Sequence, residues 1–278
     1  MPEGDTIHRT ARTLGRIWTN ATIERSAGSV AFAASLSGVR TRNVQARGKH
    51  LLIHLEDGSA IHSHMGMEGS WHVYRPGEAW RKPAFAAALH LTRPEIETVC
   101  FSPSVMELLG PMRLRQHPQL SRLGPDLLGE SFDIDEALQR LLADPSLPLG
   151  VALMDQRRVA GIGNVYKSEL CFIHRLDPFS PIGAFSTSTL AELLLYAREL
   201  MQLNMHEVAR TTRTRATAPA TRMVLGDPRR GRHWVYERSG RDCYVCHTRI
   251  RVRRQSELGR TTYFCPRCQA GSDDERRR

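Results

Sequence analysis

The chain begins Met-Pro-Glu-Gly-Asp-Thr, so Pro2 becomes the terminal residue if the initiator methionine is removed. Its nitrogen is then a free secondary amine, and an α-amino group with a pKa of about 7.7–8.0 is partly unprotonated at neutral pH. Attack of this amine on a sugar C1′ carbon would give a permanently charged iminium, which divides one difficult step into easier ones. Glu3 stands beside it and could transfer protons. Many chains begin Met-Pro, so the two residues alone fit an ordinary start as well.

Four of the six cysteines stand in two Cys-x-x-Cys pairs with 18 residues between them, and they are Cys243, Cys246, Cys265 and Cys268. This spacing is typical of a zinc site, because four thiolates complete a tetrahedral shell. Such a shell has no open position for catalysis, so the zinc would be structural. Two redox-active pairs are the alternative. The single Cys100 and Cys171 lie in apolar stretches and are expected to be inert core thiols.

Several other residues could bind nucleic acid, although each also fits a structural role. The turn at 161–164, Gly-Ile-Gly-Asn, opens a helical pattern whose backbone N–H groups favour phosphate, but a plain helix–helix turn fits equally well. It fails the dinucleotide fingerprint, because Tyr166 stands where a glycine is needed. Met67, close to Met65, could wedge into a base stack around an everted nucleotide or simply belong to the core.

Two basic residues and two histidines are also candidates. Lys49 follows Arg-Gly at the start of a hairpin strand and by itself fits a solvated surface charge. Arg260 precedes the second cysteine pair on the strand side of the zinc hairpin, where an exposed arginine could contact phosphate. His62 and His64 alternate on one strand face. They are not interpreted as metal ligands, because the cysteines already form the one credible site.

The elements that would position these residues change character along the chain. Residues 5–18 fit a helix capped by Asp5 or Thr6, with apolar residues along one face. The stretch from about residue 20 to 102 is typical of β-strands, and Asp57-Gly58 predicts a hairpin turn within it. From about residue 117 onward the pattern is helical.

The C-terminal half predicts three main helices, at residues 133–143, 161–172 and 186–203. Residues 206–232 are rich in Arg, Thr and Gly and predict a long basic loop. The last residues, 271–278, predict a disordered tail.

Length and charge limit the class of protein. The 278 residues leave room for two domains. A formal net charge of +10 favours an anionic partner, with nucleic acid first, although a ribosome-like or merely basic protein also fits. The chain lacks an apolar run long enough to span a membrane, and the charge at Glu3 argues against a secretory signal. We therefore expect a cytoplasmic, nucleoid-associated protein.

Several segments together resemble the Fpg/Nei family of DNA glycosylases, and more narrowly its endonuclease VIII branch. The start MPEGDT resembles that branch, ARGKHLL resembles the hairpin that carries the family lysine, and SHMGMEGSW resembles the following strand and loop. HPQLSRLGPDLL resembles the segment that enters the helical domain, and LMDQRRVAGIGNVYKSEL resembles the helix-two-turn-helix motif. WVYERSGRDCYVC with GRTTYFCPRCQ resembles the terminal zinc finger. The matches follow family order over nearly the whole chain.

The resemblance implies an α+β fold. An N-terminal catalytic β-sandwich with a leading helix would span residues 1–115, and a helical helix-two-turn-helix domain would span 116–235. A C-terminal four-cysteine zinc finger, holding one structural zinc ion, would occupy 236–270, before the tail at 271–278.

The resemblance also implies a bifunctional DNA glycosylase and abasic-site lyase of base excision repair. Pro2 would form a Schiff base after removal of Met1, with Glu3 as the proton donor. Lys49 would assist β-elimination, and Arg260 would assist δ-elimination and grip phosphate. The implied DNA contacts are Met67, which fills the gap left by the everted nucleotide, and Arg122 and Asn164, which bind the backbone. Damaged DNA is the expected partner, and a monomer is the expected state.

Two departures from the family pattern bear on the base that is removed. The formamidopyrimidine branch carries Asp-Pro-Arg-Arg-Phe in its second intercalation loop, whereas this chain has Cys-Phe-Ser-Pro-Ser-Val at 100–105, which favours oxidised pyrimidines. The SHMGMEG loop, in contrast, has a methionine like the formamidopyrimidine branch and lacks the polar-aromatic filler of endonuclease VIII. An 8-oxoguanine-type glycosylase and a non-catalytic DNA-binding protein on the same scaffold are the alternatives.

Overall fold

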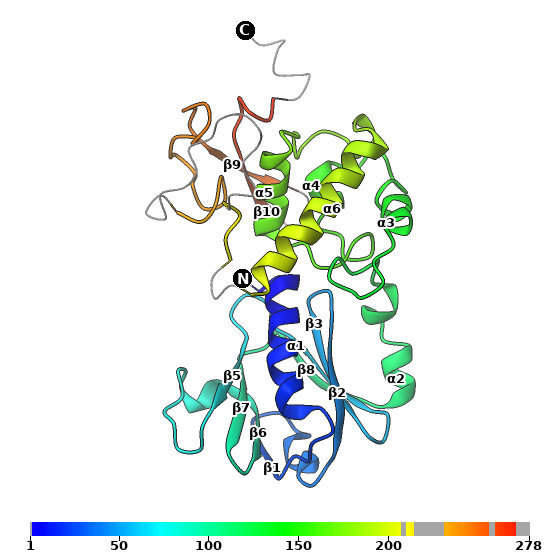
Figure 1. Cartoon of the computed structure of the whole chain (residues 1–278), viewed down its shortest axis with the longest axis vertical. Coiled ribbons are helices and arrows are strands. Elements are labelled where there is room, and N and C mark those ends of the chain that lie inside the picture. Colours follow the sequence, from blue (N-terminus) through cyan, green and yellow to red (C-terminus); the bar gives the residue numbers. More distant parts are fainter. Residues whose placement is uncertain (1, 207–209, 214–230, 256–258, 271–278) are drawn as a thin grey trace. The chain divides into compact units, whose positions relative to one another are not determined.

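The computed structural model describes residues 2–206, 210–213, 231–255 and 259–270. It contains two compact units, of which the first ends at Leu123 and the second begins at Gly124 (Figure 1). Most of the predicted basic loop and all of the predicted tail lie outside the described residues. The finer division of the chain at 115 and 235 stays a prediction. Within the described ranges, no helix is long and apolar enough to cross a membrane.

The first unit opens with helix α1 (Gly4–Trp18). Apolar residues recur every three or four positions and bury one side of the helix, namely Ile7, Ala11, Leu14, Ile17 and Trp18. The predicted helix is confirmed, but the predicted cap is wrong, because Glu3 is the N-cap. The carbonyl oxygen of Glu3 accepts hydrogen bonds from the backbone N–H groups of Thr6 and Ile7 at 3.0 and 3.1 Å. Asp5 therefore lies inside the first turn, where the helix dipole favours an acidic side chain.

Two four-stranded antiparallel sheets follow, as predicted for a β-sandwich. One sheet has the order β1-β6-β7-β5, with bounds Arg25–Ala27, Ala87–Arg93, Ile96–Phe101 and Ser70–Tyr74. The other has the order β2-β3-β4-β8, with bounds Thr41–Arg47, His50–Leu55, Ala60–His64 and Val105–Leu109. The predicted hairpin turn joins β3 to β4, and Gly58 there has a φ of +83°, which favours glycine.

Alternation along β3 and β4 sends their side chains to two different environments. Leu51, Ile53 and Ile61 join α1 in the main apolar core of this unit. The opposite face carries Leu52 and Ala60, which pack against Leu109 and Leu120 in a smaller apolar cluster.

Helix α2 (Pro111–Arg115) and the short 3-10 helix η3 (Leu120–Arg122) follow β8. The remaining 3-10 helices are η1 (Ala33–Leu36), η2 (Ala84–Ala86) and η4 (Ile182–Ala184).

The second unit is mainly helical. Its helices are α3 (Ile134–Leu141), α4 (Leu149–Ala152), α5 (Asn164–Ile173) and α6 (Thr187–Asn204). The three predicted helices are therefore confirmed, and the side chains of Asp133 and Ser186 cap α3 and α6. The helices share one apolar core, and a separate antiparallel hairpin follows, with strands β9 (Arg251–Gln255) and β10 (Arg260–Phe264).

Candidate functional site

The Pro-Glu start is held by the fold. Glu3 is completely buried, and Pro2 before it is half-buried. Because the Glu3 carbonyl caps α1, the nitrogen of Pro2 lies one residue from a packed helix. A group fixed in this way is presented at a defined geometry, which is what proximity catalysis requires.

Lys49 lies in the tight turn between β2 and β3, where Gly48 has a φ of +56°. The lysine is half-buried. Burial lowers the pKa of His64, and the positive charge of Lys49 lowers it further, so the two side chains interact electrostatically. The Nδ1 atom of His64 accepts a hydrogen bond from the backbone N–H of Gly66 at 3.2 Å and lies 3.0 Å from the Ser104 hydroxyl. His64 thereby ties the surroundings of Lys49 to the next loop.

That next loop exposes one of its two methionines. Met67 is 72% exposed, whereas Met65 is buried in the core. The Lys82 ammonium donates a hydrogen bond to the carbonyl oxygen of Glu68 at 2.7 Å, which fixes the loop beside Met67. Arg122, at the end of η3, is also exposed. The side chains of Met67 and Arg122 are therefore accessible to a ligand.

In the second unit, the start of α5 meets the start of β10. Asn164, the first residue of α5, is 5% exposed, and its side-chain N–H group donates to the Thr261 hydroxyl at 3.5 Å. Its side-chain oxygen is buried without a hydrogen-bond partner. Lys167 donates to the Thr261 carbonyl oxygen at 3.1 Å and fixes the strand against the helix. Asn164 is thus brought next to the strand that begins with the exposed Arg260.

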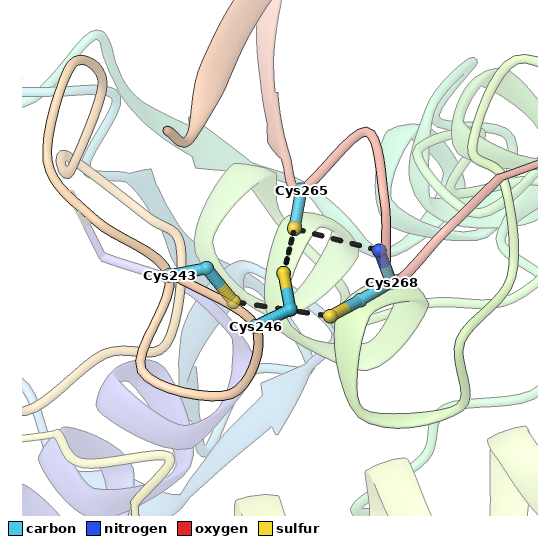
Figure 2. Close-up of side chains that lie close together, drawn as sticks. All are labelled: Cys243, Cys246, Cys265 and Cys268. Carbon is cyan, nitrogen blue, oxygen red and sulfur yellow. Dashed lines mark hydrogen bonds between the residues drawn. The ribbon is translucent and has the colours of Figure 1, made fainter. Parts of the chain in front are cut away.

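The four predicted zinc ligands converge on one point (Figure 2). Cys243 and Cys268 have their sulfur atoms 3.9 Å apart, those of Cys246 and Cys265 are 3.4 Å apart, and all four lie within 4.8 Å of one another. Sulfurs about 2.3 Å from a tetrahedral zinc ion lie about 3.8 Å apart. The donor set and its spacing therefore fit one metal ion.

The ionisation of these thiols also fits a cation. Hydrogen bonding from Cys265 lowers the pKa of Cys243 to about 5, and the same contact raises the pKa of Cys265. Burial raises the pKa of Cys268 to about 12. Without a cation, one thiolate is favoured at the expense of its neighbours, whereas a bound cation would allow all the thiols to lose their protons.

Comparisons with known proteins decide the family. Residues 1–102 match the model described as the formamidopyrimidine-DNA glycosylase N-terminal domain, and residues 123–216 match its H2TH domain. A protein named probable endonuclease 8 2, from Streptomyces coelicolor, is 39% identical over 98% of this chain and 95% of its own length. The chain belongs to the Fpg/Nei family.

Further Fpg/Nei proteins resemble the chain over nearly its whole length. DNA-(apurinic or apyrimidinic site) lyase Nei2 of Mycolicibacterium smegmatis is 36% identical over 98% of this chain and all of its own. The crystal structure of MutM (Fpg) protein from Thermus thermophilus superposes with a TM-score of 0.75 at 28% identity, covering 98% of this chain and 100% of that one. The family resemblance and the α+β fold predicted from the sequence are confirmed.

One further residue fixes the segment that precedes the first cysteine pair of this Fpg/Nei protein. Glu169, in the middle of α5, is completely buried. Its carboxylate accepts hydrogen bonds from the backbone N–H groups of Trp234, Val235 and Tyr236 at 2.7 to 2.8 Å, and from the Thr212 hydroxyl. No sequence signal marks it, because its backbone partners lie at least 65 residues further along the chain.

We expect Glu169→Gln to lower the free energy of unfolding by about 3 kcal/mol, because the amide loses the charge and turns a donor toward buried N–H groups. Chemical denaturation would measure the change. Glu199→Gln, on the exposed face of α6, is the matched control and should stay within about 0.5 kcal/mol of the unmodified protein. Equal effects of the two substitutions would contradict this role of Glu169.

A second group of titratable side chains lies in the first unit. The Nδ1 atom of His62 and the Nε2 atom of His117 lie 2.8 and 3.0 Å from one oxygen of Glu107. These three residues are close enough to one another to share a metal ion. The Nδ1 atom of His50 lies 2.9 Å from the Nε2 atom of His62 and extends the group. In the sequence, His62 and His64 alternate on one strand face, but no sequence pattern pairs His62 with Glu107.

Hydrogen bonding at His117 argues against a metal ion in this group. The backbone N–H groups of Gln119 and Leu120 donate to the Nδ1 atom of His117 at 3.3 and 3.2 Å. That atom is therefore an acceptor, and the ring proton of the neutral imidazole must lie on Nε2, which faces Glu107. A nitrogen that carries a proton has no lone pair for a metal. The group is a hydrogen-bonded chain.

Acid should destabilise the fold through His50. Burial lowers the pKa of His50 from its ordinary 6.5 to about 3. Between these values the unfolded chain binds a proton that the folded chain does not, so the free energy of unfolding should fall as the pH drops from 6.5 toward 3, by on the order of a few kcal/mol. Urea denaturation at a series of pH values would measure it. His50→Gln should weaken this pH dependence, and an unchanged slope would contradict the assignment.

Proposed function

We propose that this Fpg/Nei protein is a bifunctional DNA glycosylase and abasic-site lyase of base excision repair, acting through the terminal amine of Pro2. The observation that carries the proposal is the packed Pro2-Glu3 start, with a buried carboxyl group next to the amine. The relative named DNA-(apurinic or apyrimidinic site) lyase Nei2 supports it.

In the proposed reaction, the Pro2 nitrogen attacks C1′ of the damaged nucleotide, loses its proton, and the base leaves with the electron pair of the glycosidic bond. Glu3 then protonates the ring oxygen O4′, and the C1′–O4′ bond breaks to give the iminium. The iminium that forms is an electron sink, so a proton can leave C2′ while the bond to the 3′ phosphate breaks. Lys49 assists this β-elimination as acid or base. Arg260 assists the second, δ-elimination by neutralising the 5′ phosphate that leaves.

Damaged DNA is the proposed partner, and we propose contacts from side chains of both units. Met67 would occupy the space left by the everted nucleotide, since its side chain is largely exposed on a fixed loop. Eversion costs a few kcal/mol and costs least at a damaged pair, which itself favours lesions. Arg122 and Asn164 would bind the backbone, and the net charge of +10 would make the affinity salt-dependent.

We propose one zinc ion at Cys243, Cys246, Cys265 and Cys268. With four thiolate ligands the ion would stabilise the fold and leave no position for substrate. Its place in the function would be to hold the hairpin that carries Arg260.

Oxidised pyrimidines are the proposed bases. The supporting observations are the segment Cys-Phe-Ser-Pro-Ser-Val at 100–105 and the higher identity to relatives named endonuclease 8. A protein named formamidopyrimidine-DNA glycosylase, from Methylococcus capsulatus, is 31% identical over 84% of this chain. Excision from duplexes that carry 5-hydroxyuracil, dihydrouracil or 8-oxoguanine would test the preference, and faster removal of 8-oxoguanine would refute it.

Borohydride trapping on a duplex with an abasic site tests the activity itself. A lyase of this kind leaves a covalent adduct after reduction, whereas a DNA-binding protein without activity leaves none. The intact mass must be measured in parallel, because a retained Met1 blocks the amine. Absence of an adduct with correctly processed protein would refute the proposed function.

A further inference from the structure

We infer that His50, His62, Glu107 and His117, the histidine network, position Lys49 for the proposed lyase reaction. The inference rests on the proposed function, because the network would act only by positioning Lys49, whose part in the reaction is itself proposed. None of the four needs to touch DNA. They would act by fixing the turn that carries Lys49 and by setting the charge around it.

Strand register places the network on one sheet face. His50 pairs with His64 across β3 and β4, and His62 pairs with Glu107 across β4 and β8. Residues two apart on a strand share a face. The face opposite the main core therefore carries the side chains of His50, His62, His64 and Glu107. His117, between α2 and η3, reaches this face and completes the network.

The hydrogen bonds of the network run in one direction. Because His117 must donate its Nε2 proton to Glu107, the carboxylate is ionised and accepts from His62 as well. His62 then carries its proton on Nδ1, which leaves its Nε2 atom to accept from the Nδ1 proton of His50. His62 and His117 therefore donate directly to Glu107, and His50 donates to His62. His50, at the far end, keeps an unprotonated Nε2 atom.

Burial makes the network rigid. His62 is completely buried and His50 is 6% exposed, whereas the Glu107 side chain is 38% exposed. A buried chain in which each hydrogen bond is satisfied has few alternative arrangements. His50 directly follows Lys49 in the chain and its ring packs against that of His64, with the ring centres 4.9 Å apart. The network therefore fixes β3, the strand that follows the turn, and the ring of His64, which interacts electrostatically with Lys49.

The charges around the network leave Glu107 as its one negative group. Burial lowers the pKa of His50, His62 and His64, so that these rings are neutral at neutral pH. Although burial opposes it, hydrogen bonding from His62 and His117 lowers the pKa of Glu107.

Positive groups face this cluster from other elements. Arg47, on β2, lowers the pKa of His50, and Lys49, in the β2–β3 turn, lowers the pKa of His64. Glu107 therefore supplies a negative charge to a site that otherwise contains neutral rings and cations.

Glu107→Gln tests the network, because it keeps the shape of the side chain and removes its charge. The measurement is the single-turnover rate of strand cleavage on a preformed abasic-site duplex, at saturating enzyme and across pH. We expect the rate to fall about tenfold, since small displacements of a reacting group have large effects. The pH profile of the rate should change as well, because His64, whose ring packs against that of His50, interacts electrostatically with Lys49.

His62→Phe is the second variant and should lower the rate similarly by breaking two hydrogen bonds of the network. Glu97→Gln is the matched control, because Glu97 accepts a hydrogen bond from His90 at 3.1 Å in the other sheet. It should leave both rate and pH profile unchanged. Thermal unfolding of each variant would identify any that fails to fold, and the isosteric Glu107→Gln then decides.

The outcomes separate the network from the proposed function. If the unmodified protein cleaves the duplex and Glu107→Gln behaves like Glu97→Gln, the positioning role is overturned and the lyase proposal stands. If the unmodified, processed protein forms no adduct, both fail. Metal analysis gives a third outcome: two zinc ions per chain in the unmodified protein and one in Glu107→Gln would mean a metal centre and would also overturn the network.

Discussion

Replacement of Pro2 by glycine is expected to reduce the rate at which borohydride-trapped adduct forms on abasic-site DNA by about a hundredfold, equivalent to about 2.7 kcal/mol of barrier. Glycine keeps a terminal amine but makes it primary, so the substitution tests whether the reaction needs the secondary amine of proline. A primary amine gives an imine that can lose its proton and its charge, whereas the iminium of proline stays charged and keeps withdrawing electrons. The ring also locks rotation about the N–Cα bond, which restricts the direction of the nitrogen lone pair next to α1.

The matched control is Pro111→Gly, which removes another proline beside a helix start, at the first position of α2. It should leave trapping unchanged. The intact mass of each variant must show removal of Met1, because a blocked amine would imitate the effect. An adduct of normal yield with processed Pro2→Gly would exclude proline chemistry and leave the proposed mechanism without its nucleophile.

Local patterns were enough to predict most of the elements. The apolar period that buries Ile7, Leu14 and Trp18 defines α1 in the sequence as well as in the structure. The turn at Gly58 defines a hairpin, because two antiparallel strands flank it at short range. These signals lie within one helix or one turn. The N-cap was misassigned because Asp5 is the better capping residue by type, while Glu3 caps with its backbone alone.

Contacts between distant residues could not be predicted from the sequence. Glu169 has the spacing of an ordinary helical glutamate, and its role is defined only by N–H groups at 234–236. His62 and Glu107 are 45 residues apart, and only the register of β4 with β8 pairs them. A slip of one residue would send His62 into the apolar core. The cluster of four cysteines could be predicted, because metal-ligand spacing is itself a local pattern.

Removal of one of the four proposed zinc ligands should have the largest effect on structure. With Cys246→Ser, we expect bound zinc to be lost and amide protection in β9 and β10 to disappear. Structural zinc contributes about 10–16 kcal/mol in finger peptides, which exceeds the total stability of many domains. A two-stranded hairpin is marginal by itself. Although Lys167 of α5 holds β10, we expect β9 and β10 to need the contribution of the metal as well. Metal analysis and hydrogen exchange would measure the two effects.

Cys171→Ala is the matched control, since Cys171 is a buried cysteine of α5 outside the cluster. Burial raises the pKa of this thiol to about 12, so it stays protonated and has no part in binding a cation. The control should keep its zinc and its hairpin protection. In Cys246→Ser, the amides of α6 should stay protected, because that helix packs in an apolar core without the cysteine cluster. Undiminished protection of β10 in zinc-free protein would show that the hairpin folds without metal, and Arg260 would then owe its position to α5 alone.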